Sequence, residues 1–212
     1  MKGISEKTLI KIKDLKASVK LNNGDMLTTV TNANMELQRG RSYAIVEVRL
    51  RQTSLISIIG LLNREYEGEY LYDGISISAL KDRDLSILRA NNIGFVFQNY
   101  SLIKHLRVWE NIELPLLYAK KSFTAKQRHE IITGLLKSVG LESKENDYPI
   151  NLSGGEQQRV AIARALAVSP EAILCDEPTG ALDKKTGTQI MELLHSVVKE
   201  NGNYAAVGYA RS

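Results

Sequence analysis

A serine followed by two glycines stands at the start of a helical stretch in the third quarter of the sequence. Ser153, Gly154 and Gly155 precede a run of helix-forming residues that extends to Val168. Glycines leave the first backbone N–H groups unobstructed, and the N-terminal end of a helix carries a partial positive charge, so this arrangement suits a phosphate. We interpret the three residues as a candidate phosphate-binding site; an ordinary helix cap and loop is the alternative.

Three stretches of the sequence carry a family resemblance. Leu152–Arg159 reads Leu-Ser-Gly-Gly-Glu-Gln-Gln-Arg, which resembles the signature of the ATP-binding cassette (ABC) family. Ala172–Asp183 begins with an apolar run that ends in two carboxylates and is similar to the family's magnesium-binding strand and D-loop, and Gly94–Tyr100 resembles its Q-loop. Within this family, the sequence most resembles cassettes that serve lipoprotein release or the export of macrolides and antimicrobial peptides. The segments that carry this closer match are Ile58–Leu62, Gly68–Gly74, Glu110–Ile112 and Pro178–Asp183.

The resemblance covers nearly the whole chain and implies roles for individual residues, with ATP and Mg²⁺ as cofactors. Asp176 is expected to hold Mg²⁺, and Glu177 to act as the general base toward the attacking water. Gln98 is expected to reach both the metal and that water, and Thr53 to give the metal a hydroxyl ligand. The nucleotide-binding residues that it implies are Thr53, Ser54, Gln98, Ser153, Gly154, Gly155, Asp176 and Asp183.

The phosphate-binding loop departs from the family pattern. That pattern is a glycine, four residues and then Gly-Lys-Ser/Thr, whereas residues 47–54 read Glu-Val-Arg-Leu-Arg-Gln-Thr-Ser. The glycines are absent, Gln52 stands at the lysine position and the loop is one residue short. Side chains obstruct a cradle of inward-turned amides, and Gln52 brings no positive charge to the phosphates. We therefore expect this chain to bind and hydrolyse ATP poorly.

Two further positions lack residues that the family resemblance leads one to expect. Val19 stands where an aromatic side chain would stack on adenine. After Val207 the family continues Val-Thr-His, but residues 208–212 read Gly-Tyr-Ala-Arg-Ser, so we expect the chain to be truncated at this switch region without its histidine. The three histidines present, His105, His129 and His195, lie outside any motif.

Shifts of the reading frame offer one explanation for both altered segments. Consider a gene segment that encodes Gly-Lys-Ser-Gly-Ser-Gly-Lys-Thr, an intact phosphate-binding loop. If this segment loses two bases at its start and a third base nearer its end, it can encode residues 47–53 of this chain. One inserted base after Val207 would likewise turn Val-Thr-His into Gly-Tyr-Ala. True divergence toward a role without nucleotide is the alternative hypothesis.

The elements that must position these residues alternate between strand and helix, which predicts an α/β domain. With the resemblance, we expect a P-loop NTPase-type ABC cassette over residues 1–212, with a mainly parallel core sheet, an N-terminal antiparallel β portion and an inserted helical subdomain over about 99–160. Strands are expected over 8–19, 27–38, Tyr43–Val46, Gly68–Gly74, Ile93–Phe97, Ala172–Cys175 and Tyr204–Val207. Helices are expected over Ser54–Leu62, 107–140 with breaks near Pro115 and at Lys120–Thr124, Ser153–Val168 and Thr186–Glu200.

Composition narrows the class of protein. The 212 residues carry a formal net charge of only +4 with lysine and arginine spread along the chain, so a nucleic-acid partner is not expected. The single cysteine, Cys175, excludes an internal disulfide and favours a reducing compartment. Because the sequence has no apolar run of about 18 residues, we expect contact with a membrane only through a partner.

The family resemblance implies an ATPase subunit of a transporter that pairs head to tail with a second cassette and binds a separate membrane permease, at the cytoplasmic face of the cell membrane. Export is the expected direction. Two alternatives remain open: an inactive cassette that contributes only its signature to an active partner, and a frame-shifted decay product. Cassettes that act on DNA or ribosomes usually carry a second cassette or a coiled-coil insertion, which this sequence lacks.

Overall fold

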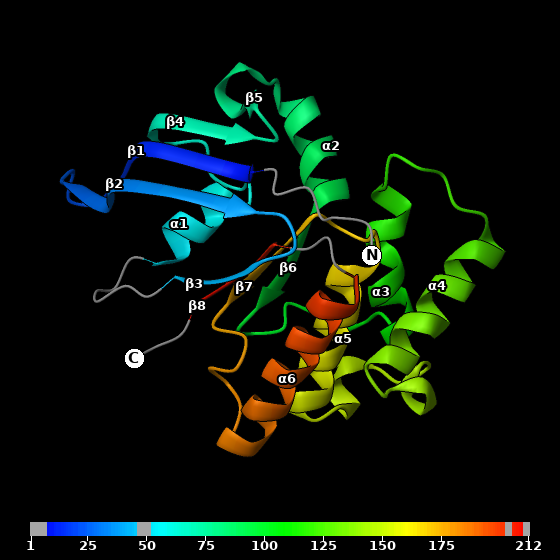
Figure 1. Cartoon of the computed structure of the whole chain (residues 1–212). Helices are drawn as coiled ribbons and strands as arrows, with labels where there is room; N and C mark the ends of the chain where they lie inside the picture. The colour runs from blue at the N-terminus through cyan, green and yellow to red at the C-terminus, as the bar shows by residue number, and fades with distance from the viewer. Residues whose placement is uncertain (1–7, 46–51, 202–204, 210–212) are drawn as a thin grey trace.

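The computed structural model describes residues 8–45, 52–201 and 205–209. The strands are β1 (Thr8–Lys20), β2 (Met26–Gln38), β3 (Ser42–Ile45), β4 (Glu67–Tyr72), β5 (Ile75–Ser76), β6 (Ile93–Phe97), β7 (Ala172–Asp176) and β8 (Ala205–Tyr209). The helices are α1 (Gln52–Ile59), α2 (Asp82–Asn92), α3 (Val108–Tyr118), α4 (Ala125–Ser138), α5 (Gly154–Leu166) and α6 (Lys184–Asn201). Figure 1 shows the strands on one side and α3, α4 and α5 gathered on the other.

Two four-stranded sheets form the β part of the protein. The first is antiparallel in the order β2-β1-β4-β5, and the second has the order β3-β8-β7-β6 with parallel pairing throughout. Helix α1 contacts both β2 and β7 and so lies between the sheets (Figure 1). The predicted combination of an antiparallel N-terminal portion and a parallel core is confirmed.

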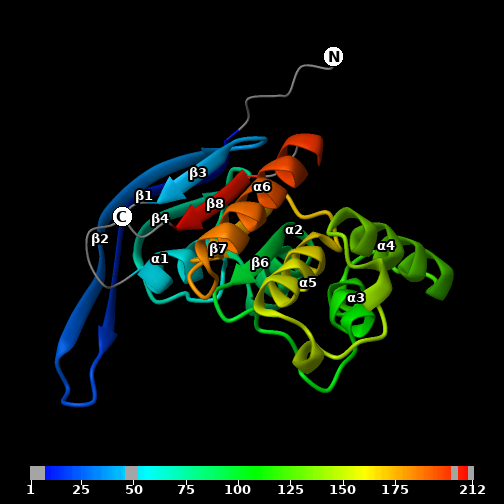
Figure 2. The same cartoon turned by 90° about the horizontal axis from the view of Figure 1, so that it is seen from below.

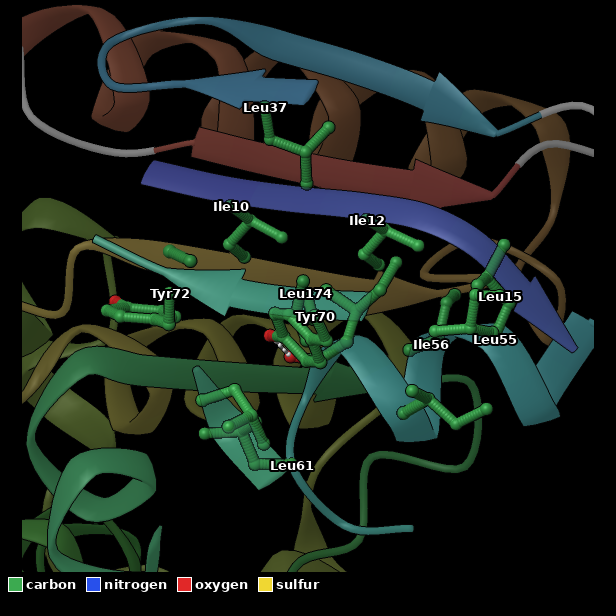
Figure 3. Close-up of a cluster of buried hydrophobic side chains, with 14 of the residues drawn as sticks. Ile10, Ile12, Leu15, Leu37, Leu55, Ile56, Leu61, Tyr70, Tyr72 and Leu174 are labelled. Atoms are coloured by element: carbon green, nitrogen blue, oxygen red, sulfur yellow. Dashed lines mark hydrogen bonds between the residues drawn. The ribbon is translucent and has the colours of Figure 1, made fainter. Parts of the chain in front are cut away.

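Strand β7 separates two hydrophobic cores because its side chains alternate between the faces of the sheet. Ala172 and Leu174 belong to the core under the antiparallel sheet, where Leu174 lies among side chains of β1, β4 and α1 (Figure 3). Ile173 and Cys175 belong to the core formed with α3, α4, α5 and α6. Burial raises the pKa of the Cys175 thiol to about 12, so this thiol is unreactive at neutral pH.

The predicted helix break near Pro115 is wrong. Helix α3 runs through Pro115 from Val108 to Tyr118, and the chain leaves helical structure only after it, before α4 starts at Ala125. A proline removes one backbone hydrogen bond from a helix interior. Val108, Ile112 and Leu116 are buried on one face of α3, and their packing offsets that loss.

Close contact between α5 and β6 requires a glycine at position 94. A Cβ atom built on Gly94 would lie 2.4 Å from the carbonyl oxygen of Ala165, a backbone atom of α5. We therefore expect Gly94→Ala to lower the free energy of unfolding by about 1–3 kcal/mol through overpacking. Gly134 in α4 has open space around its Cβ position, so Gly134→Ala should instead stabilise by about 0.5–1 kcal/mol. Urea denaturation of both variants checks the pair; equal effects would contradict this packing account.

Candidate functional site

Two predicted catalytic residues leave the parallel sheet at the same edge. Strands β6 and β7 are parallel neighbours, and Phe97 at the end of β6 pairs with Asp176 at the end of β7. Gln98 and Glu177 each follow directly, so both emerge at the carboxyl edge, where open α/β sheets place their ligands. Neither the adjacency of these strands nor their register is visible in the sequence.

Gly180 shows how close these two side chains come. A Cβ atom at Gly180 would lie 2.7 Å from Nε2 of Gln98 and 2.9 Å from Oε2 of Glu177. The N–H of Gly180 donates to the carbonyl of Glu177 over 2.9 Å, which turns the chain back over the strand end. The structure therefore brings an amide, a carboxylate and a glycine into one cluster, which we call the Gly180 cluster.

Glu177 adopts a backbone conformation that side chains rarely take. Its φ is 45°, in the left-handed region, which costs about 1–3 kcal/mol for a residue other than glycine and is found mainly at functional sites. This strained turn directs the chain from the end of β7 into Pro178–Gly180. This backbone strain and the position of Glu177 beside Gln98 both support a catalytic role for Glu177.

Asp176 is half-buried, and its burial, together with the charge of Glu177, raises the pKa of the Asp176 carboxyl group. A cation placed beside these two carboxylates would favour the ionised form of both. Carboxylate and amide oxygens are the ligands that Mg²⁺ prefers, so Asp176 and Gln98 fit this ion. No group of three or more His, Cys, Asp and Glu within the described ranges could hold a metal, so Mg²⁺ would need further oxygen ligands.

The predicted phosphate-binding loop can be followed only in part. Residues 46–51, which include most of the altered segment, lie outside the described residues. Helix α1 begins directly after them, so the backbone of Gln52, Thr53 and Ser54 forms its first turn. Strand β3 ends at Ile45 in the same sheet as β7, with β8 between them. The chain order strand, loop and helix is thus the one that the P-loop prediction requires.

The signature region forms the N-terminus of α5. The Ser153 hydroxyl accepts a hydrogen bond from the Glu156 N–H over 3.3 Å. The N–H and the hydroxyl of Ser153 each donate to Oε2 of Glu156 over 2.8 Å. These bonds form a capping box, in which the serine and the glutamate satisfy each other's backbone groups. Ser153 is exposed, so the helix end that the sequence predicts to bind phosphate faces solvent.

The signature glycines lie against the segments that follow β6 and β7. A Cβ at Gly154 would lie 2.7 Å from the hydroxyl oxygen of Tyr100 and 3.3 Å from a methyl group of Leu182, and one at Gly155 would lie 2.6 Å from a methyl group of Thr186. Only glycine fits at these positions without displacing those neighbours. Tyr100 had no predicted role; its position two residues after Gln98 was the available signal.

Asp183 is exposed and caps the N-terminus of α6. Its Oδ1 accepts a hydrogen bond from the N–H of Thr186 over 3.0 Å, and this bond lowers the pKa of the Asp183 carboxyl group. The structure thus gives Asp183 a local structural role; the predicted contact with a second cassette stays a prediction.

The predicted adenine position lies in β1, and the predicted switch region begins at the end of β8. Val19 lies in β1 opposite Leu27 in β2. Gly208 and Tyr209 continue β8, while residues 210–212 lie outside the described residues. His105, in the segment between β6 and α3, His129 in α4 and His195 in α6 are exposed, as expected for surface residues.

Acid is expected to weaken the cap on α5. Hydrogen bonds from Ser153 lower the pKa of Glu156 in the folded protein, so its contribution to stability is complete above the unfolded pKa of about 4.3 and is lost as the pH falls through the folded pKa. Glu156→Gln keeps a residue that suits a capping box but cannot titrate. Unfolding free energies measured across this pH range should therefore fall less steeply in Glu156→Gln; parallel curves would contradict the assignment.

Comparison with known proteins decides the family. The sequence profile described as ABC transporter matches residues 30–180. The chain belongs to the ABC transporter family. An ATP-binding protein of Methanocaldococcus jannaschii, MJ0796, is 39% identical over 202 residues, which are 94% of this chain and 86% of that protein. Cassettes of this family are ATPases, and this chain has the cassette fold.

Solved structures agree with this assignment. A dimeric structure of MJ0796 in a post-hydrolysis state, bound to ADP and Pi, matches with a TM-score of 0.84 and 36% identity over 95% of this chain and 88% of that one. The cassette is also 38% identical to the macrolide export ATP-binding/permease protein MacB of Campylobacter fetus and 37% identical to the methionine import protein MetN of Haemophilus influenzae. It spans 30% of that MacB and 55% of that MetN.

Proposed function

We propose that this cassette is the ATP-binding subunit of a transporter and acts with a separate membrane permease at the cytoplasmic face of the cell membrane. The observation that carries the proposal is the Gly180 cluster, where Gln98 and Glu177 meet beside Asp176 at the carboxyl edge of the parallel sheet. Among the described helices, none is both long and apolar enough to cross a lipid bilayer.

The side chains of the site would have separate roles in metal binding and in proton transfer. The carboxylate of Asp176, the amide oxygen of Gln98 and the hydroxyl of Thr53 would hold Mg²⁺, and Ser54 would add a polar group at the start of α1. Bound Mg²⁺-ATP supplies the γ-phosphoryl group that is transferred to water. Glu177 would accept the proton of that water, since its carboxylate lies beside the Gln98 amide, which can orient the same molecule.

The chain's own phosphate cradle does not fit a triphosphate. Residues 47–52 offer neither the glycines that let amides turn inward nor the lysine that neutralises the phosphates. Charge from Arg49 and Arg51 attracts phosphate without positioning it, and positioning is most of phosphoryl-transfer catalysis. We therefore propose that this cassette is impaired at its own nucleotide site, so that the roles given above to Asp176, Gln98 and Glu177 support little turnover in the unchanged chain.

The signature side fits the role of a contributor to another cassette's ATP. Ser153, Gly154 and Gly155 form a helix N-terminus at which Ser153 is exposed and the two glycines are half-buried, and such a helix end suits a phosphate. MJ0796 is dimeric in the structures that match this chain. We propose a head-to-tail pair in which these residues, with Asp183 nearby, face the nucleotide held by the partner. This is the role of an inactive cassette beside an active one.

Export is the proposed direction of transport. The MacB export relatives and the MetN import relatives are similarly identical to this chain, so overall identity does not favour either direction. The support for export is the resemblance of Ile58–Leu62 and Glu110–Ile112 to exporting cassettes. We further propose that residues 1–212 form one domain, in which 99–160 is a helical subdomain built from α3, α4 and the start of α5.

A mixed-cassette assay tests this function. An intact cassette whose own signature serine has been replaced is combined with this chain, and ATPase activity is measured. Ser153→Asp keeps a good helix cap but places a negative charge where the phosphate would lie, so activity should fall by at least about tenfold. Ser138→Asp, on an exposed part of α4, is the matched control and should leave activity unchanged. Equal activity with Ser153→Asp, or no stimulation by this chain, would contradict the proposal.

A further inference from the structure

Gln158 places an amide in the interior of the protein, in the second turn of the signature helix α5. Among the described residues three polar side chains are buried, those of Thr29, Asn111 and Gln158, and the last two residues are 0% exposed. The Thr29 hydroxyl donates to the carbonyl of Ala17, and the Asn111 amide is hydrogen-bonded to backbone groups of residues 103–107. Within the same described ranges, neither Oε1 nor Nε2 of Gln158 has a hydrogen-bond partner.

An amide buried without partners lowers stability, because it has given up its hydrogen bonds to water and gained none in return. Exchanging the assigned oxygen and nitrogen of Gln158 does not change this, since neither atom has a partner. A charged ligand does not fit, because a neutral amide cannot compensate its charge in an apolar interior. A single water molecule fits, because it can accept from Nε2 or donate to Oε1 and still bond a further group.

Helix geometry locates this amide. A side chain in an α-helix leans over the residues three and four positions before it, and for Gln158 these are Gly155 and Gly154. Helix α5 contacts α3, β6 and α6, and Figure 2 shows it side by side with α6. The amide of Gln158 therefore lies over the two signature glycines, where α5 meets the segments that follow β6 and β7.

One polar group reaches the same place from another part of the chain. The atoms that approach the Cβ positions of Gly154 and Gly155 most closely are the hydroxyl oxygen of Tyr100 and methyl groups of Leu182 and Thr186. Of these atoms only the Tyr100 hydroxyl can form a hydrogen bond. It makes no direct hydrogen bond to the amide of Gln158, so a molecule placed between the two groups would satisfy both.

We propose that Gln158 binds one buried water molecule, which bridges its side-chain amide to the Tyr100 hydroxyl and holds the first turns of the signature helix in place. The glycines at positions 154 and 155 allow the neighbouring segments to approach closely but bring no polar side chain of their own. The water supplies the missing polar contact. Gln158 is thus a positioning residue for the signature, and this role does not depend on nucleotide binding.

A high-resolution crystal structure of the unchanged chain tests the site without any substitution. The expected result is an ordered water within hydrogen-bond distance of both the Gln158 amide and the Tyr100 hydroxyl. The proposal is overturned if that water is missing. This holds whether the amide is bare, is bonded directly to protein atoms, or binds a water that does not reach Tyr100.

The sign of a stability change tests the water site in solution. Methionine is similar to glutamine in length and adapts to its surroundings, but it lacks the amide. If Gln158 binds no water, Gln158→Met removes an unsatisfied group and should raise the urea midpoint. If the water is bound, the change removes its contacts, and we expect the midpoint to fall. Gln189→Met, at an exposed position of α6, is the matched control and should leave the midpoint unchanged.

A double-mutant cycle tests the bridge to Tyr100. Tyr100→Phe removes only the hydroxyl group. If Gln158 and Tyr100 share one water, the double variant should lose clearly less stability than the sum of the two single losses, because either change breaks the same bridge. Additive losses, or a raised midpoint in Gln158→Met, would contradict the proposal.

Hydrogen exchange separates positioning of the signature from a general loss of stability. The N–H groups of Glu156 and Gln157 donate to Ser153, so their exchange reports on the start of α5. Under native conditions they should exchange at least about fivefold faster in Gln158→Met. The N–H of Arg128 at the start of α4 donates to the carbonyl of Thr124 and should be unaffected. Equal acceleration at both helix starts would show general loosening and refute the positioning role.

Discussion

Rebuilding residues 47–52 as a glycine-rich loop that ends in lysine, with one residue added, is expected to raise the affinity for Mg²⁺-ATP by about hundredfold or more. The glycines free the backbone amides to surround the phosphates, and the lysine adds a charge-assisted contact. Helix α1 already begins at Gln52, so the new loop would lead into an existing helix N-terminus. Isothermal titration calorimetry of the rebuilt and unchanged chains measures the difference.

Gln52→Lys alone separates charge from geometry. Because this change leaves Val48, Leu50 and the two arginines in the loop, we expect only a small part of the gain. If the lysine alone restored full affinity, the steric argument would be wrong. If the rebuilt loop gained nothing, some other part of the pocket, such as the adenine position at Val19, would be the cause of weak binding.

Removing the carboxylate of Glu177 is expected to have a large effect only after this repair. In the rebuilt cassette Glu177→Gln should lower the ATPase rate by about 10²–10⁴-fold, the range typical of a positioned general base. In the unchanged chain it should alter a near-background rate very little. The amide is nearly isosteric, so contacts around Gly180 should persist. Steady-state phosphate release measures both.

Glu142→Gln, an exposed change before the signature, serves as the matched control and should leave the rate unchanged. A rebuilt cassette that hydrolyses ATP equally well with glutamine at position 177 would show that Glu177 is not the base. A marked loss in the unchanged chain would instead show that the altered loop supports real turnover.

Much of the fold could be predicted from the sequence, because consecutive residues determine where an apolar strand lies and where a helix begins. Ala172–Cys175 and Ile93–Phe97 were recognisable as buried strands, and the helix expected to open at Ser153 begins at Gly154. Helix α2 was not predicted, because Leu85 is its one buried residue and its apolar periodicity is weak. Pro115 misled the prediction since tertiary packing overrode its local preference.

The candidate site was predictable in its residue types but not in its assembly. The resemblance named Gln98 and Glu177, whereas their meeting at Gly180 depends on the adjacency of β6 and β7, which α3, α4 and α5 separate in the sequence. Gln158 had no predicted role, because its burial depends on how α5 packs against α3, β6 and α6. Contacts of this kind leave no local signal in a single sequence.

Calorimetric titration of Mg²⁺-ATP into the purified, unchanged chain tests most directly whether its own nucleotide site is crippled. We predict no saturable binding in the micromolar range, because the backbone amides and the lysine that a triphosphate needs are not supplied by residues 47–52. Tight binding of one nucleotide per chain would contradict this account, although membership of the ABC transporter family would stand.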